Sequence, residues 1–212
     1  MLITKQDDLD RACKALAQSP FITVDTEFLR ERTYFPVLCL IQIAAPDVAP
    51  VAVDPLEDSL DLSPLSDLIF EPKITKVFHA ARQDLEIIYN LTEAIPAPLF
   101  DTQIAAMVCG HGEQIGYGAL VSAVCKKTVD KGSQFTDWSR RPLSDRQLTY
   151  ALEDVSHLRD IYMHLSQELT QKNRIDWVAA EMAVLNNPAT YANDPDTAWQ
   201  RIKIRSDKPK VL

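Results

Sequence analysis

The residues best suited to chemistry in this sequence are carboxylates that stand within apolar segments. Asp25 and Glu27 lie in the run FITVDTEF, which is otherwise rich in apolar and β-branched residues and short enough for a strand. Side chains two positions apart in a strand project from the same face, so both carboxylates are expected to point the same way. Two neighbouring carboxylates that lose hydration require a cation or protons to offset their repulsion. The alternative is an edge strand whose acids face water, and the run alone leaves both readings open.

The spacing of this pair carries no information by itself. A chain with 30 acidic residues is expected to contain about four pairs of acids separated by one residue. Four such pairs occur, and only the pair in FITVDTEF lies inside an apolar run. Sequence context, and not spacing, therefore distinguishes Asp25 and Glu27 from the other pairs.

Two more acids and a tyrosine stand out by position. Tyr150 and Asp154 are four residues apart in a long predicted helix and share a face, with Asp154 on the flank of the apolar stripe. Asp84 falls in the first turn of a helix predicted after the strand at 74–79, where the positive end of the helix dipole favours its ionised form. Each of these acids, taken alone, is also consistent with an ordinary surface position.

The elements that must position these residues alternate along the chain. Apolar and β-branched runs predict strands at 21–28, 37–44, 50–55, 74–79 and 98–100. Apolar periodicity predicts helices at 7–17, 64–70 (with Ser63 as N-cap), 81–91 (with Leu85, Ile88 and Leu91 inward), 101–109, 117–125 and 174–186. The longest helix begins at a capping box formed by Ser144 and Gln147 and continues to about residue 171. This order predicts an α/β fold with a mixed sheet flanked by helices.

Composition and charge set broad limits. The 212 residues are 46% hydrophobic and 25% charged, as in an ordinary globular protein. The net charge of −8 argues against a general nucleic-acid coat protein, and no P-loop or dinucleotide-binding glycine motif occurs. An acidic start without an apolar core predicts no signal peptide, and no apolar run is long enough to span a membrane. Four cysteines without a C-x-x-C pair predict reduced thiols, so a cytoplasmic protein is expected.

In combination, these segments resemble the DEDD exonuclease superfamily. VDTEF, VFHAARQDLEIIY and YALEDVSHL are similar to its three exonuclease motifs and occur in the same order. A tyrosine four residues before the last acid is typical of the DEDDy branch. Within that branch, FDTQIAA and QFTDWSRRPLSDRQLTYALEDV resemble ribonuclease D, and the match covers about residues 21–169. The resemblance implies an RNase H-like fold, a mixed sheet with helices on both faces.

The resemblance also implies an activity, a metal-dependent 3′→5′ exoribonuclease that releases 5′-mononucleotides from RNA 3′ ends, either single-stranded or tRNA-precursor-like. The implied metal ligands are Asp25, Glu27, Asp84 and Asp154, and the implied catalytic tyrosine is Tyr150. In the family mechanism Asp25 bridges two divalent ions, Glu27 and Asp154 complete the ion that activates water, Tyr150 orients that water, and Asp84 holds the leaving-group ion. Hard oxygen ligands favour Mg²⁺ or Mn²⁺.

Two alternatives stay open at this point. A 3′→5′ exonuclease acting on DNA would use the same metal core, because that core does not read the sugar. A non-catalytic scaffold that binds nucleic acid is the second alternative, although the complete set of acids argues against it.

Candidate substrate contacts come from the motif flanks and from a basic loop. Residues 126–146 contain six basic and three acidic residues, interrupted by one tryptophan that could stack on a base. The alternative for this loop is that the tryptophan closes the core and the arginines are solvated or pair with helix acids. A structural role for His79 is equally open. The candidate contacts are Thr26, Phe28, His79, Gln83, Trp138 and Arg141.

The chain is expected to form an exonuclease domain at residues 1–186 and a C-terminal extension or linker at 187–212. The helical C-terminal domains of longer family members are not expected in it, and a monomer is favoured. Residues 200–212 carry five basic groups and one acid. With little other basic surface, binding to nucleic acid is expected to be weak, end-directed and sensitive to salt.

Overall fold

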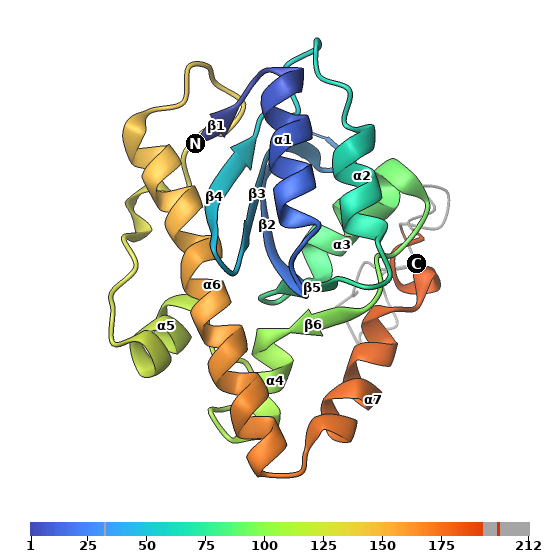
Figure 1. Cartoon of the computed structure of the whole chain (residues 1–212), viewed down its shortest axis with the longest axis vertical. Helices are drawn as coiled ribbons and strands as arrows, with labels where there is room; N and C mark the ends of the chain where they lie inside the picture. Colours follow the sequence, from blue (N-terminus) through green and yellow to red (C-terminus); the bar gives the residue numbers. More distant parts are fainter. Residues whose placement is uncertain (32, 193–198, 200–212) are drawn as a thin grey trace, which may run out of the picture.

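A six-stranded mixed sheet organises the chain (Figure 1). The computed structural model describes residues 1–31, 33–192 and 199. The strands are β1 (Leu2–Ile3), β2 (Phe21–Leu29), β3 (Val37–Ala45), β4 (Val48–Val53), β5 (Thr75–Phe78) and β6 (Leu99–Asp101), in the order β1-β4-β3-β2-β5-β6. Strands β2, β3 and β4 form an antiparallel meander, whereas β1 pairs with β4, and β5 with both β2 and β6, in parallel.

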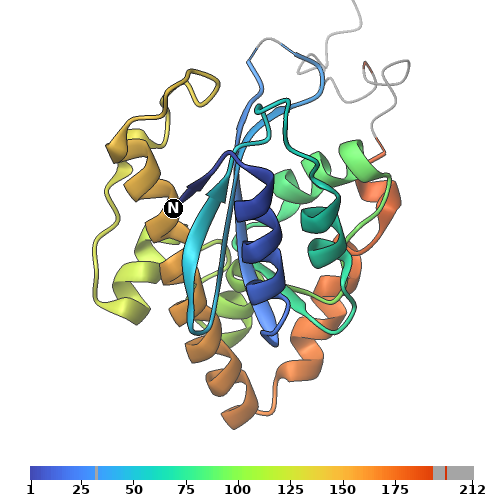
Figure 2. The same cartoon turned by 45° about the horizontal axis from the view of Figure 1, so that its top comes forward.

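One face of the sheet is covered by α1 (Gln6–Leu16), α2 (Ser63–Phe70) and α3 (Arg82–Thr92). The layers separate clearly in Figure 2, where α1 and α2 lie on the side of the sheet opposite to α6 (Asp145–Gln171). Leu9, Cys13 and Leu16 of α1 are buried in a core cluster that includes Val51 and Val53 of β4, the strand that α1 contacts. Central strand β3 is buried on both faces, which is why it reads as a nearly continuous apolar run.

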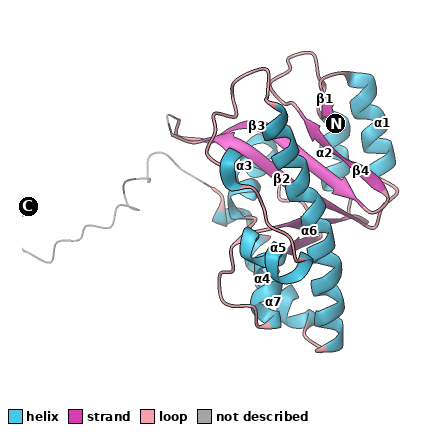
Figure 3. Ribbon diagram, turned by 90° about the vertical axis from the view of Figure 1, so that its left-hand side faces the viewer, coloured by secondary structure: helices cyan, strands magenta, loops and turns pink. Residues whose placement is uncertain are grey.

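The other face is crossed by α6, the longest helix, which contacts β2, β3, β4 and β5 (Figure 3). Helices α4 (Thr102–Cys109), α5 (Tyr117–Cys125) and α7 (Ile175–Leu185) gather around its C-terminal half. The hydroxyl of Thr23 on β2 donates to the carbonyl oxygen of Val155 on α6 at 2.8 Å, with both groups buried. This bond fixes the middle of α6 against the central strand.

The elements predicted from the sequence are present, with bounds that differ by one or two residues. The capping box of Ser144 and Gln147 forms as predicted at the start of α6. Strand β1 was not predicted, because two apolar residues are too short a signal, and β4 begins two residues earlier than expected.

Two predicted helix details are wrong. Leu62, and not Ser63, is the N-cap of α2, and the Asp61 carboxylate accepts from the Ser63 amide and hydroxyl instead. Leu91 is 66% exposed, because α3 turns Ile87 toward the sheet with Leu85 and Ile88.

The chain continues to pack beyond α7. Tyr191 is 1% exposed, its ring lies 6.2 Å from that of Tyr89 on α3, and its hydroxyl donates to the Leu185 carbonyl at 2.9 Å. Residues 193–198 and 200–212, most of the expected extension, lie outside the described residues. Within the described part of the chain no helix combines the length and apolarity needed to cross a bilayer. All four cysteines are free, three of them buried.

Candidate active site

A cavity of about 120 Å³ lies between β2 and the first half of α6. Its walls come from segments that are far apart in the sequence: strand β2, the residue that follows β5, the first turn of α5, and α6. The polar side chains that line it are Asp25, His79, Tyr117, Tyr150 and Asp154. The fold thus brings residues of all three exonuclease-like motifs to one place.

Strand β2 directs its two acids to the face covered by α6, as the strand period predicted. Asp25 lies opposite Gln42 and Glu27 opposite Leu40 in the antiparallel ladder with β3, and a register shift follows Glu27. Burial raises the pKa of Asp25 to about 6. Burial, and then the charges of Asp25, Asp154 and Asp84, raise the pKa of Glu27 to about 10.

Asp84 joins this group from the first turn of α3. It is 7% exposed, and its Oδ1 accepts a 2.5 Å hydrogen bond from the hydroxyl of Thr26, which projects from the opposite face of β2. The helix dipole was expected to favour the ionised form of Asp84, but burial acts against it. Burial and the charge of Asp25 raise its pKa well above the usual range, and the Thr26 hydrogen bond only partly opposes them.

Helix α6 contributes Tyr150 and Asp154, one turn apart. Burial and the charge of Asp25 raise the pKa of Asp154 to about 8, and a hydrogen bond from Tyr150 acts in the opposite direction. Burial and the neighbouring carboxylates raise the pKa of the Tyr150 hydroxyl, which therefore stays protonated at neutral pH. Asp154 Oδ1 is buried without a hydrogen-bond partner. Glu153, which directly precedes Asp154 on α6, is exposed as predicted.

The hydrogen bonds around His79 determine which of its ring nitrogens carries the proton. The Thr102 hydroxyl has one hydrogen, which it donates to the Phe78 carbonyl at 3.1 Å, so at 3.0 Å it accepts from His79 Nδ1. Burial lowers the pKa of His79, which favours the neutral ring. Nε2 is then a hydrogen-bond acceptor, and it is buried without a partner at the cavity.

Asp101 is a positioning residue that the sequence analysis did not assign. Its carboxylate accepts from the amides of Ala80 and Ala81 at 3.0 and 2.8 Å and from that of Gln103 at 2.8 Å. It therefore holds the turn between His79 and Asp84 while it caps α4. An aspartate directly before a predicted helix is an N-cap signal that could have revealed it. Tyr117, also missed, carries no comparable signal in the sequence.

The donor set fits a divalent cation although the side chains are not gathered around one. Four carboxyl groups, one with a buried unpartnered oxygen and all with raised pKa values, supply hard oxygen ligands whose ionised forms a bound cation would favour. Among the described residues no three Asp, Glu, His or Cys side chains converge into a ready-made metal cluster. The Asp84 carboxylate is turned toward Thr26, which accounts for part of this separation.

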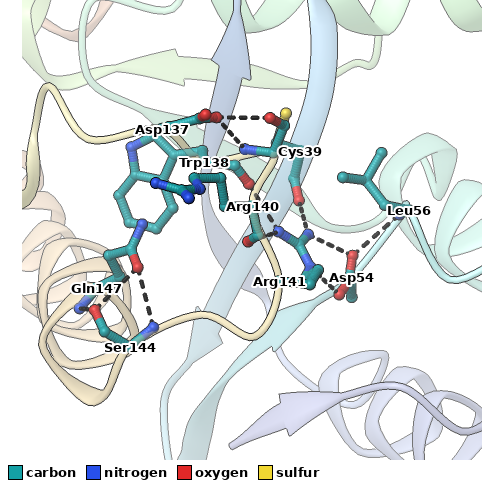
Figure 4. Close-up of polar contacts among 10 residues, drawn as sticks. Cys39, Asp54, Leu56, Asp137, Trp138, Arg140, Arg141, Ser144 and Gln147 are labelled. Atoms are coloured by element: carbon teal, nitrogen blue, oxygen red, sulfur yellow. Dashed lines mark hydrogen bonds and ion pairs between the residues drawn. The ribbon is translucent and has the colours of Figure 1, made fainter.

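Two of the predicted substrate contacts are corrected by the structure (Figure 4). Trp138 is 2% exposed and packs near Tyr150, with 6.2 Å between ring centroids, so it has no free face for a base. The guanidinium of Arg141 is bound within the protein, to Asp54 and to main-chain carbonyls. Arg146 likewise pairs with Asp130 at 2.9 Å. The alternative reading of the loop is correct for Trp138, whereas the acids that pair with Arg141 and Arg146 lie outside the helices.

The remaining predicted contacts lie around the acids. Thr26 is buried and bound to Asp84, Phe28 is half-buried just after the register shift of β2, and Gln83 is exposed in the first turn of α3. Their positions are compatible with contacts to a terminal nucleotide, which stay predictions.

Comparison with known proteins agrees with this geometry. A 3′-5′ exonuclease family model matches residues 1–170. A ribonuclease D of Jannaschia sp. is 53% identical over 99% of this chain and 55% of its own length, so the chain spans about half the length of such curated relatives.

Solved structures show the same fold. Escherichia coli RNase D, an exoribonuclease involved in structured RNA processing, superposes with a TM-score of 0.87 at 36% identity, over 95% of this chain and 53% of that one. Brucella melitensis NrnC with bound Mg²⁺ superposes with a TM-score of 0.73 at 25% identity, over 91% of this chain and 92% of that one. The fold is RNase H-like, the predicted ribonuclease D-like resemblance is confirmed, and the chain belongs to the 3′-5′ exonuclease family.

Proposed function

We propose that this chain is a 3′→5′ exoribonuclease that hydrolyses RNA from its 3′ end and releases 5′-mononucleotides. The observation that carries the proposal is the single cavity that unites Asp25, His79, Tyr150 and Asp154 from the three motifs. The similarity to ribonuclease D supports RNA as the substrate class. RNA 3′ ends, single-stranded or resembling a tRNA precursor, are the partners that we propose.

The acids would hold two divalent cations, Mg²⁺ or Mn²⁺, with Asp25, Glu27, Asp84 and Asp154 as ligands. Bound cations would supply charge neutralisation at the phosphate and a lowered pKa for the attacking water. The Mg²⁺ in the Brucella relative supports this choice of ion. Burial and repulsion raise the pKa values of these acids. The acids must lose their protons to bind a cation, so the affinity for the cation should increase as pH rises.

The chain's own polar groups can orient the reactants. The Tyr150 hydroxyl keeps its proton and stands beside Asp154, so it can hold a water molecule next to that carboxylate. His79 Nε2, as an acceptor, can receive a hydrogen bond from a hydroxyl group of the terminal ribose. We propose Thr26, Phe28 and Gln83 as further contacts to that nucleotide.

The direct test is digestion of RNA labelled at its 5′ end, with Mg²⁺ or Mn²⁺ present. We expect a ladder that shortens from the 3′ end, 5′-mononucleotide products, and a loss of at least a thousandfold in rate for Asp25→Asn, on the order of the catalytic share of a metal site. Glu153→Gln, an exposed acid beside Asp154, is the matched control and should retain full activity. Full activity of Asp25→Asn would contradict the assignment of the site.

A DNA exonuclease and a non-catalytic scaffold make different predictions in the same assay. A matched DNA oligonucleotide should be degraded more slowly than RNA, and preference for DNA would reject the ribonuclease proposal. A scaffold would bind either oligonucleotide without shortening it.

A further inference from the structure

Arg141 and Asp54 form a partly buried connection between the sheet and the segment that leads into α6. Asp54 directly follows β4, its side chain is 6% exposed, and its backbone amide donates to the Ile3 carbonyl at 3.1 Å. Its Oδ1 also accepts from the Leu56 amide at 3.1 Å. These contacts hold Asp54 at the end of the sheet independently of Arg141.

Every N–H group of the Arg141 guanidinium has an acceptor. Nε and Nη2 donate to the two carboxylate oxygens of Asp54 at 2.5 and 2.6 Å, a bidentate pair. Nη2 donates its second hydrogen to the Cys39 carbonyl at 2.8 Å, and Nη1 donates to the carbonyls of Trp138 and Arg140 at 2.7 and 3.0 Å. With all five donors used, Arg141 has none left for a phosphate. Figure 4 shows the guanidinium between Asp54 and the carbonyl of Cys39.

This connection continues to the catalytic tyrosine. Arg141 holds the main chain at Trp138, whose buried ring packs against Tyr150 at an interplanar angle of 36°. It also lies three residues before Ser144, the N-cap of α6. Cys39, Ala52, Trp138, Leu143 and Ala151 form a separate buried cluster at this end of α6, with Tyr150 packed against it.

We propose that the Asp54–Arg141 pair is a clamp that positions Tyr150, acting through Trp138 and the start of α6. This inference rests on the proposed function, because it assigns the clamp a role in that reaction. Neither residue contacts the substrate. A tyrosine that orients a reacting group must hold its place to a fraction of an ångström, and a misplacement of about 1 Å can cost up to a hundredfold in rate. A lysine cannot form the bidentate pair or reach the three carbonyls at once.

The test is a double-mutant cycle on the full chain, with Arg141→Lys or Asp54→Asn combined with Tyr150→Phe, measured by steady-state kinetics on a 5′-labelled RNA. We expect each clamp variant to lower kcat by about tenfold or more with KM within about twofold, since binding groups are untouched. In the Tyr150→Phe background the same variants should cost less than about twofold, because the residue they position is already disabled. Arg11→Gln, which breaks the exposed Arg11–Asp8 ion pair on α1, is the matched control and should change nothing.

The possible failures are distinguishable. Circular dichroism and thermal melting verify that each variant is folded at the assay temperature. If Arg141→Lys does not fold, the near-isosteric Asp54→Asn tests whether the Asp54–Arg141 pair positions Tyr150. Equal losses with and without Tyr150→Phe, or a lowered melting temperature with unchanged kcat, would overturn the clamp while leaving the nuclease intact. An inactive wild type, or an active Asp25→Asn variant, would instead reject the proposed function.

Discussion

At the scale of single residues, the site consists of neighbouring carboxyl groups that repel one another when they are ionised. Burial raises the pKa of Asp25 to about 6, and burial together with the charges of neighbouring carboxylates raises the pKa of Asp154 to about 8 and that of Glu27 to about 10. The strand period predicted that Asp25 and Glu27 share a face, because that depends on two neighbouring residues only. The ionisation of Asp84 could not be predicted, since a dipole effect of about 0.3–1 kcal/mol competes with a burial that the sequence does not show.

These pKa values predict how the stability of the metal-free protein depends on pH. The folded state binds these protons more tightly than the unfolded chain, whose carboxyls titrate near pH 4, so the stability that these groups contribute is greatest below about pH 4 and is lost as pH rises toward 8 and beyond. In EDTA at pH 8 we expect Asp154→Asn to melt several degrees above the wild type, at about 2–4 °C per kcal/mol. Thermal melts at pH 5 and pH 8 measure this.

The same melts contain their controls. Glu153→Gln should follow the wild type, and adding Mg²⁺ at pH 8 should raise the melting temperature of the wild type more than that of Asp154→Asn. If the difference in melting temperature between Asp154→Asn and the wild type in EDTA did not grow from pH 5 to pH 8, the predicted repulsion at the site would be contradicted.

At the scale of elements, local signals were sufficient for helices and strands but not for the contacts between them. The capping box at Ser144 and the apolar period of α6 are local, and both were predicted correctly. The role of Arg141 depends on Asp54, 87 residues earlier, which no local pattern reveals. For the same reason Trp138 was predicted to face a base, although the loop folds its ring into the core.

The Asp101 carboxylate provides an element-scale prediction. It satisfies three buried or half-buried amides at the start of α3 and α4, so Asp101→Ala should lower the free energy of unfolding by about 2–3 kcal/mol. Urea denaturation measures this. Asp61→Ala removes a comparable but exposed turn contact at α2 and should cost less than about 1 kcal/mol. If the two variants lost the same free energy of unfolding, the buried hydrogen bonds of Asp101 would contribute no more to stability than the exposed ones of Asp61.

At the scale of the whole molecule, the distribution of charge matters more than its sum. Residues 200–212 contain five basic groups and one acid, so the other 199 residues hold 17 basic and 29 acidic groups, or −12 in place of the total −8. With Arg141 and Arg146 engaged by acids, the described part of the 126–146 loop offers fewer free cations than its composition predicted. The fold class itself followed from element order, since strand–helix alternation admits few architectures.

Sparse basic surface predicts few phosphate contacts, so substrate capture should be sensitive to salt but with a moderate slope. For two or three phosphate contacts on a single strand, log kcat/KM should fall with log[KCl] at a slope of about −2 at fixed Mg²⁺. Lys127 is an exposed residue of the basic loop, and we propose it as one of these contacts, so Lys127→Gln should make the slope shallower by about 0.7. Lys5→Gln, an exposed lysine on α1's N-terminal side, should leave the slope unchanged. A slope steeper than about −5 would indicate a broad basic surface instead.

The short edge strands have a consequence for handling the protein. β1 is two residues long and covers the outer hydrogen-bonding groups of β4, with the Ala52 amide donating to the Met1 carbonyl at 2.9 Å. Deleting residues 1–4 would leave the six-residue, mostly apolar strand β4 as an open edge, a template for pairing with a second molecule. Residues 1–4 therefore protect the edge of β4 from pairing with another molecule. We expect preparations that lack these residues to aggregate under conditions in which they are still folded.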